Sequence, residues 1–264
     1  MADKYLSVNG KRLHYTQNGQ GDCIVFVHGF IESIYIWERF DKVLSEKFKV
    51  ICIDLPGHGQ SDRFGEEHSI EMQAKLIKLV LEQENISSLT LIGHSMGGYV
   101  CLSFALQYPE CTKAVGLFHS HAGPDSSYTT EFRNKTIDLL NADKDGFITH
   151  FVPDLFAEGN AVHFPKQVEK LVTDGKAMDV NSIIASQIGM RDRGSFLSVY
   201  EQKIPFMFIQ GKRDTKSNLQ KVMAQAMMPL HSEILLVDSG HMGFFEQEQV
   251  CVSFVKGFVE RVYL

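Results

Sequence analysis

The feature that most restricts the fold of this chain is a glycine-rich turn centred on Ser95. The apolar run 89–92 before it is typical of a buried strand, and from Tyr99 onward apolar residues return at helical spacing. Gly93 and Gly97 flank Ser95 two residues away on each side, where side chains would obstruct a sharp strand-to-helix turn. The pattern therefore places the Ser95 hydroxyl at the tip of a strained turn, just ahead of a helix N-terminus.

Strands and helices are predicted in alternation on both sides of this turn. An alternating run interrupted by Asn9-Gly10 predicts an N-terminal hairpin of two antiparallel edge strands. Other apolar runs predict buried strands at 23–27, 50–54, 114–118, 205–209 and 233–237. Helices are predicted at about 35–47, 70–81 and 246–263, besides the helix that follows Ser95. This order favours a mostly parallel sheet with flanking helices.

The strand pattern stops after residue 118. Four segments look helical and contain no period-two run: 130–140, 147–156, 165–172 and 180–188. So long a helical stretch between two strands exceeds an ordinary crossover. We therefore predict an α/β core formed by residues 1–118 and 204–264, with residues 119–203 inserted as a helical cap.

Five short motifs resemble those of the α/β-hydrolase superfamily, specifically its small cap-bearing serine esterases. They occur in the family's order and span nearly the whole chain: Val27-His28-Gly29-Phe30, Asp54-Leu55-Pro56-Gly57-His58-Gly59-Gln60-Ser61, Gly93-His94-Ser95-Met96-Gly97-Gly98, Gly211-Lys212-Arg213-Asp214 and Ser239-Gly240-His241. The resemblance implies a Ser-His-Asp triad of Ser95, His241 and Asp214. It also implies an oxyanion hole formed by the main-chain N–H groups of Phe30 and Met96, and no cofactor.

The residues themselves support the same grouping. A serine hydroxyl needs a base within reach and a third group to orient that base. Asp214 and His241 each follow a predicted strand, and parallel strands end at one edge of a sheet, so both can meet Ser95 there. Each of the three residues also has a purely structural interpretation: Ser95 as a helix N-cap, Asp214 as a turn residue and His241 as a loop residue. Asp125, after an earlier strand, is the alternative acid.

The remaining histidines are interpreted as loop-supporting or pocket-lining residues, not as catalytic ones. His28, His58 and His94 belong to loop motifs in which a ring holds a turn or a neighbouring loop. His119 and His121 follow the strand that leads into the cap and are predicted to line the mouth of the substrate pocket. Their spacing permits metal binding, but without a nearby third ligand we predict no metal site.

Two charged segments in the predicted cap have alternative interpretations. The segment 141–148 follows the opening of an EF-hand calcium loop, but Val152 stands where the loop needs a bidentate carboxylate, so a turn between cap helices is favoured. Arg191 and Arg193 are interpreted as a solvated or cap-anchoring cluster. If they faced the pocket, acidic substrates would become attractive.

Composition restricts the partners and the compartment. A net charge of −6 argues against nucleic-acid binding, because no basic stripe could neutralise phosphates. The five cysteines are an odd number and several lie in apolar runs, so a disulfide framework is not expected. The chain shows no secretory h-region and no apolar stretch of membrane-spanning length. We therefore expect a cytoplasmic protein with a small-molecule partner and no membrane association; its oligomeric state is open.

The resulting functional prediction is a serine hydrolase, of carboxylesterase type, that cleaves a small apolar carboxylic ester through an acyl-enzyme. Dehalogenation is disfavoured because the relatives that catalyse it carry aspartate where this chain has Ser95. Cofactor-free C–C bond hydrolysis and perhydrolysis use the same triad and stay as alternatives. A ligand-sensing receptor of the same fold is the alternative from another functional class.

Overall fold

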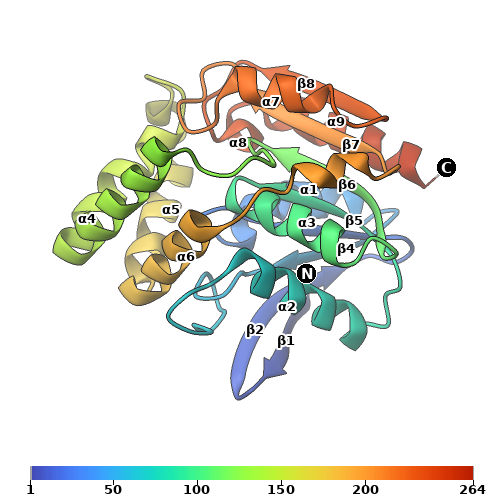
Figure 1. Cartoon of the computed structure of the whole chain (residues 1–264), viewed down its shortest axis with the longest axis horizontal. Helices are drawn as coiled ribbons and strands as arrows, with labels where there is room; N and C mark the ends of the chain where they lie inside the picture. Colours follow the sequence, from blue (N-terminus) through green and yellow to red (C-terminus); the bar gives the residue numbers. More distant parts are fainter. Residues whose placement is uncertain (1, 264) are drawn as a thin grey trace.

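A computed structural model describes residues 2–263, so the terminal residues 1 and 264 of the predicted core lie outside the described part. Within it, eight strands form one sheet (Figure 1): β1 (Ala2–Val8), β2 (Lys11–Asn18), β3 (Cys23–Val27), β4 (Lys49–Ile53), β5 (Leu89–His94), β6 (Thr112–Phe118), β7 (Phe206–Gly211) and β8 (Ser232–Val237). The strand order is β1-β2-β4-β3-β5-β6-β7-β8. All pairings from β4 to β8 are parallel, as predicted.

The N-terminal hairpin forms at the predicted turn. Asn9 and Gly10 have φ angles of 49° and 76°, the left-handed conformation that such a two-residue turn requires. β1 is an edge strand, but β2 also pairs antiparallel with β4. The prediction of two edge strands is therefore wrong for β2, which joins the hairpin to the parallel part of the sheet.

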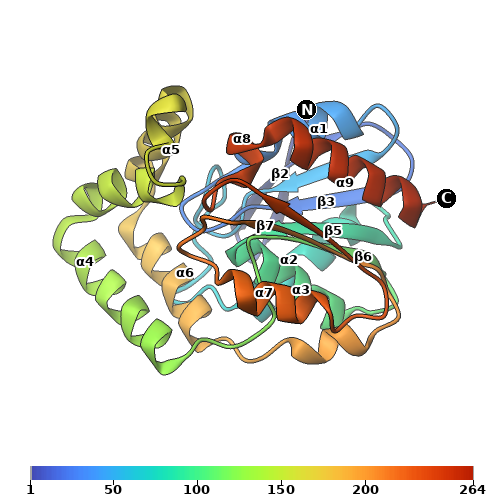
Figure 2. The ribbon, with the colours of Figure 1, turned by 90° about the horizontal axis from the view of Figure 1, so that it is seen from above.

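Helices cover both faces of the sheet (Figure 2). α1 (Glu38–Leu44) and α9 (Glu248–Val262) lie on one face, and α2 (Ile70–Gln83), α3 (Met96–Gln107) and α7 (Leu219–Ala226) lie on the other. Ser69 begins α2 as its N-cap, accepting a hydrogen bond from the Met72 main chain. The apolar strands between these two layers are buried, and burying each large apolar side chain stabilises the fold by about 1.5–3 kcal/mol.

One helix prediction differs from the structure at its start, and another is confirmed. The segment predicted as one helix at 35–47 forms a 3-10 turn, η1 (Ile34–Trp37), followed by the shorter α1. Ser33 is the N-cap of η1, and the indole of Trp37 is fully buried against Phe26 and Phe118 of the sheet. The final helix, predicted at 246–263, forms as α9, and the short α8 (Gly243–Glu246) precedes it.

Between β6 and β7 the chain forms helices beside the sheet, at the left of Figures 1 and 2. They are α4 (Ser127–Phe151), α5 (Pro165–Ala177) and α6 (Val180–Asp192), with the short turns η2 (Pro153–Leu155) and η3 (Ala161–His163); η4 (Leu197–Glu201) follows them and packs against α3. α4 consists of two helical stretches that meet at Asp143, whose φ and ψ angles of −155° and 83° are not helical, so the prediction of two helices here is confirmed. The Asp143 side chain accepts a hydrogen bond from the Gly146 main chain where the second stretch begins, so the turn predicted within 141–148 is a sharp kink at Asp143.

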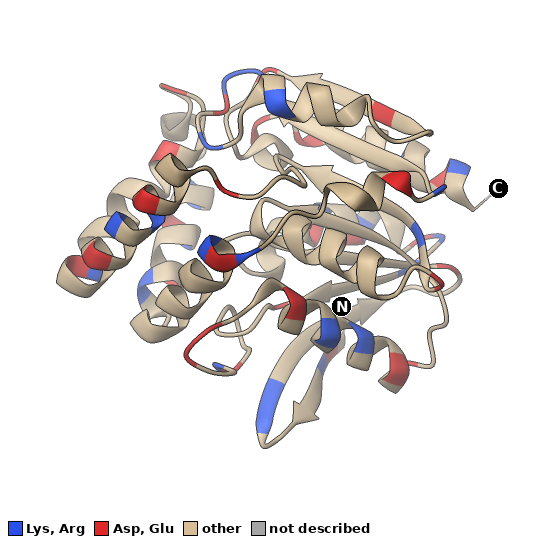
Figure 3. Ribbon diagram, viewed as in Figure 1, with Lys and Arg blue, Asp and Glu red and all other residues tan. Residues whose placement is uncertain are grey.

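Charged side chains of both signs are interspersed over the helices in the view of Figure 3, while the sheet interior carries few of them. This distribution agrees with the argument against a basic nucleic-acid-binding face. No helix among residues 2–263 combines the length and apolar character needed to cross a lipid bilayer. The cytoplasmic location stays a prediction.

Candidate active site

Ser95 lies between the end of β5 and the start of α3, with a φ angle of 49°. Such a backbone conformation is strained for a residue with a side chain. The neighbouring glycines permit it, because a Cβ atom on Gly93 would lie 2.4 Å from the Gly97 carbonyl oxygen, and one on Gly97 would lie 2.3 Å from the Val27 carbonyl oxygen. Close packing of the elbow against β3 therefore requires both glycines, and it leaves Ser95 partly exposed among buried neighbours.

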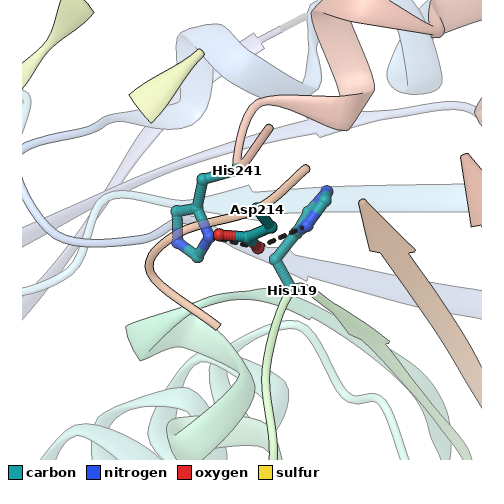
Figure 4. Close-up of side chains that lie close together, drawn as sticks. All are labelled: His119, Asp214 and His241. Atoms are coloured by element: carbon teal, nitrogen blue, oxygen red, sulfur yellow. Dashed lines mark hydrogen bonds and ion pairs between the residues drawn. The ribbon is translucent and has the colours of Figure 1, made fainter. Parts of the chain in front are cut away.

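Asp214 and His241 come together at the same end of the sheet (Figure 4). Asp214 follows β7 and His241 follows β8, and His241 Nδ1 lies 2.8 Å from Asp214 Oδ2. The other carboxylate oxygen accepts hydrogen bonds from the main-chain N–H groups of Lys216 and Ser217, at 2.7 and 3.0 Å. The carboxylate is thus fixed by its own turn and directed at the imidazole, whose Nε2 points away from Asp214.

A second histidine contacts the same carboxylate. His119 Nδ1 lies 2.9 Å from Asp214 Oδ2, and its Nε2 accepts a hydrogen bond from the Gly243 main chain at 3.3 Å. Burial lowers the pKa of His119 to about 4, against the opposing effect of Asp214, so the ring is neutral at pH 7 and donates from Nδ1. Burial alone would raise the pKa of Asp214, but His241 and His119 more than offset it and hold that pKa well below its usual range.

Ser95 and His241 line one cavity of about 500 Å³. Phe30 also lines it, and Met96 begins α3, where the first main-chain N–H groups have no partner within the helix. The cavity walls come from the sheet side and from the helices between β6 and β7, with the lining residues Phe30, Glu32, His94, Ser95, Tyr99, Tyr128, Thr129, Phe132, Arg133, Phe151, Asp154, Leu155, Gln187, Met190, Thr215, Lys216 and His241. A second cavity of about 530 Å³, near η1 and α5, contains none of the predicted site residues.

The family of the chain follows from its sequence. A model of the alpha/beta hydrolase fold family matches residues 22–248. This chain belongs to that family. The predicted superfamily and fold class are thereby confirmed.

Known proteins similar to this chain include characterised and uncharacterised ones. It is 26% identical over 273 residues to the 2-hydroxy-6-oxononadienedioate/2-hydroxy-6-oxononatrienedioate hydrolase of Escherichia coli, covering 95% of this chain and 91% of that protein. It is 34% identical over 107 residues to an uncharacterised protein of Mycobacterium tuberculosis, a match that spans 40% of this chain but only 31% of the relative's length. A thermophilic esterase from Thermogutta terrifontis, solved with malate bound, superposes over 100% of both chains with a TM-score of 0.93 at 24% identity, which shows a shared fold.

Several other residues singled out from the sequence are not among those that line the cavity. His119 lies behind Asp214, and neither His119 nor His121 is among the cavity-lining residues, so the expectation that both line the pocket mouth does not agree with the geometry. The alternative acid Asp125 is bound by Arg133 and Arg193. Arg191 lies at the surface beside Asp192, whereas Arg193 is buried with its guanidinium 3.8 Å from the centre of the Tyr99 ring.

Sequence reasoning missed the contact between His119 and Asp214. His119 follows β6 directly, and β6 pairs with β7, the strand that precedes Asp214. A histidine at the carboxyl end of the neighbouring strand is the signal that could have identified it. The facing atoms of His119, Asp214 and His241 lie within 4.8 Å of one another, a spacing that also suits a metal ion. Their nitrogens and oxygen are already paired in hydrogen bonds, which is the arrangement of an oriented base.

Proposed function

We propose that this protein hydrolyses small carboxylic esters through a covalent acyl-enzyme on Ser95. The observation that carries the proposal is the 2.8 Å contact between His241 and Asp214 at the edge of a cavity that Ser95 also lines from a strained turn. A hydroxyl, an imidazole and a carboxylate in these positions supply the nucleophile, the base and the group that orients the base. The reaction needs no cofactor, and its partner is a small-molecule substrate.

Each residue has one chemical task. His241 Nε2 accepts the hydroxyl proton while Ser95 Oγ attacks the ester carbonyl, and the negative charge develops on the carbonyl oxygen. The main-chain N–H groups of Phe30 and Met96 stabilise this oxyanion, an interaction worth roughly 3 kcal/mol per donor. Collapse breaks the ester C–O bond, and His241 returns the proton to the leaving alcohol. Water then attacks the acyl-enzyme by the same route and regenerates Ser95.

The cavity supports a substrate with an apolar portion. Aromatic rings contributed by the core and by the inserted helices line it, including Phe30, Tyr99, Phe132 and Phe151. Since α4 and α6 supply walls of this cavity, residues 119–203 act in this proposal as a cap that shapes the pocket. An acyl chain of a few carbons fits a volume of about 500 Å³.

A panel of p-nitrophenyl esters of increasing acyl length tests the proposal. The wild type is expected to turn over the shorter esters, and Ser95→Ala to lose roughly ten-thousand-fold or more of kcat. Ser195→Ala removes an exposed hydroxyl outside the cavity and serves as the matched control. Turnover that persists in Ser95→Ala would exclude the mechanism. Slow turnover coupled to a ligand-induced conformational change would instead favour the receptor alternative.

Cofactor-free C–C bond hydrolysis is the second candidate, and the likeness to the Escherichia coli hydrolase favours it. The same serine, histidine and aspartate can serve either reaction, so the site residues alone do not separate the two. Comparing kcat/KM for a 2-hydroxy-6-oxo-dienoate substrate with that for the preferred ester decides between them. A higher value for the dienoate would move the assignment from ester to C–C hydrolysis.

A further inference from the structure

A guanidinium group lies on the wall of the cavity, away from the predicted triad in sequence. Arg133 is on α4 and is mostly buried, with its Nε paired with Asp125. Its Nη1 donates to the Gln187 side-chain carbonyl at 3.2 Å and contacts the sulfur of Met190 at 3.4 Å. Arg133, Gln187 and Met190 all line the cavity that contains Ser95 and His241.

The carboxylate that pairs with Arg133 also serves a second arginine. Arg193 is fully buried at its side chain, and its Nη2 lies 2.7 Å from Asp125 Oδ1. One negative charge therefore faces two guanidinium groups. Lys221 lies nearby, and its pKa is lowered by burial and by the charge of Arg193. Three cationic side chains, those of Arg133, Arg193 and Lys221, thus surround one carboxylate, and of these four residues Arg133 is the one that lines the cavity.

The carboxylates on the cavity wall do not pair with Arg133. Glu32 is 2.8 Å from His94 Nδ1, and Asp154 is paired with the Lys216 ammonium group. Each of these carboxylates has its own partner, and neither is paired with Arg133. A ligand carboxylate at Arg133 would therefore meet no competing anion other than Asp125.

Two N–H donors at this position are left for a ligand. Because the Gln187 carbonyl accepts from Arg133, the orientation of the amide is fixed and its Nε2 is the remaining donor. Within residues 2–263, neither Arg133 Nη2 nor Gln187 Nε2 has a hydrogen-bond partner, although both side chains line the cavity. A planar guanidinium beside an amide N–H presents adjacent donors to a carboxylate.

We propose that Arg133 and Gln187 form a carboxylate-binding subsite, so that the substrate is an ester with an acidic tail, such as the half-ester of a dicarboxylic acid. The proposal rests on the proposed hydrolase function and names its substrate class. The aromatic wall accommodates the apolar carbons between the ester, which faces Ser95, and the acid group, which faces Arg133. Asp125, which is itself paired with Arg193, holds Arg133 in place.

Matched ester pairs test the subsite. Monoethyl esters of straight-chain diacids from succinate to suberate are compared with neutral esters in which an isopropyl group replaces the carboxylate, as in monoethyl adipate against ethyl 6-methylheptanoate. The wild type is expected to prefer the acidic ester of the best length by roughly tenfold or more in kcat/KM. Equal or better hydrolysis of the neutral partners at every length would overturn the proposal without needing any variant.

Variants separate recognition from a structural role. Arg133→Met is expected to lower kcat/KM for the acidic ester by roughly 10- to 100-fold, mainly through KM, and to change the neutral ester by less than about threefold. Arg133→Lys keeps the charge and should retain part of the preference. Arg191→Met is the matched control, because Arg191 is a half-buried arginine that joins α6 to Asn134 of α4 without lining the cavity. An equal loss on both esters in Arg133→Met would show that Arg133 only anchors the cap.

A binding measurement keeps this proposal separate from the proposed chemistry. Titration of Ser95→Ala with the diacid of the preferred length, or with adipate if no ester is hydrolysed, requires no turnover. Binding heat that is measured with Ser95→Ala but is absent in the double variant Ser95→Ala/Arg133→Met supports the subsite, even if the hydrolase function fails. The subsite is contradicted if the diacid does not bind Ser95→Ala. It is also contradicted if the double variant Ser95→Ala/Arg133→Met binds the diacid equally well. Either result stands even if Ser95-dependent ester hydrolysis is found.

Discussion

His94 Nδ1 lies 2.8 Å from Glu32 Oε2 on the cavity wall, and both side chains are almost fully buried. The same Glu32 oxygen accepts a hydrogen bond from the Gly29 main chain at 2.6 Å, and His94 Nε2 lies 3.0 Å from the main-chain oxygen of His241. Both ring nitrogens of His94 therefore face acceptor oxygens. Burial opposes ionisation of Glu32, but His94 more than offsets it and lowers the Glu32 pKa. The pair thus connects the loops before Phe30 and at His241 to the elbow.

Replacing Glu32 by glutamine tests this connection. The amide keeps the size of the side chain but removes the negative charge that faces His94. We expect the free energy of unfolding to fall by about 1–3 kcal/mol, the cost of an unsatisfied buried polar group, and kcat to fall with it. Glu248→Gln, at an exposed ion pair with Arg39, should change stability by less than about 0.5 kcal/mol. Urea unfolding measures the free energy of unfolding of both variants. An equal loss in Glu32→Gln and Glu248→Gln would contradict the role of Glu32.

His119 should influence turnover through Asp214 without touching the substrate. His119→Phe keeps a ring of similar shape and removes the hydrogen bond to Asp214. A hydrogen bond to a charged group contributes about 1.5–3 kcal/mol, so kcat is expected to fall roughly 10- to 100-fold while KM changes little. Asp214→Asn should cost more, because it also removes the partner of His241. Steady-state kinetics of the two variants on one ester test this, and an unchanged kcat in His119→Phe would refute it.

The positions of the site residues could be predicted because they depend on local pattern and topology. Gly93 and Gly97 mark the elbow at Ser95, and parallel strands end at one edge, which brings the residue after β7 to the residue after β8. Neither argument needs knowledge of side-chain packing. The triad roles of these residues stay a prediction until they are tested.

Features that depend on the packing of distant segments could not be predicted. Arg133 reaches the cavity only because of how α4 lies against α6, and Glu32 meets His94 across two loops. Sequence periodicity contains no information on any of these contacts.

The elbow glycines should tolerate substitution less than glycines elsewhere. Gly97→Ala would place a Cβ atom 2.3 Å from the Val27 carbonyl oxygen, and since both atoms belong to tightly packed backbone the elbow must shift. We expect a loss of roughly 3 kcal/mol or more of unfolding free energy and loss of activity. Gly194 is a matched control, because a Cβ atom there meets nothing within 4 Å. Thermal unfolding and ester assays of both alanine variants measure the difference, and a fully active Gly97→Ala would refute the packing argument.

Stability should fall as the solution becomes acidic, because several histidines are buried in the neutral form. Burial lowers the pKa of His58 and His121 to about 3 and of His68 and His119 to about 4, from an unfolded value of 6.5. Between these values the unfolded chain binds protons that the folded chain does not, so the stabilisation is complete above 6.5 and decreases as pH falls toward 4.

The size of this effect follows from the number of protons taken up on unfolding. Each such histidine contributes a slope of up to about 1.4 kcal/mol per pH unit, which amounts to on the order of 1–2 kcal/mol between about pH 7 and about pH 5. His14 acts in the opposite direction, because Asp54 and Asp3 outweigh its burial and raise its pKa. Urea unfolding at the two pH values measures the net change, and His68→Gln should reduce it by the share of one histidine. A free energy of unfolding that stayed level or rose on acidification would show that these rings are not held neutral.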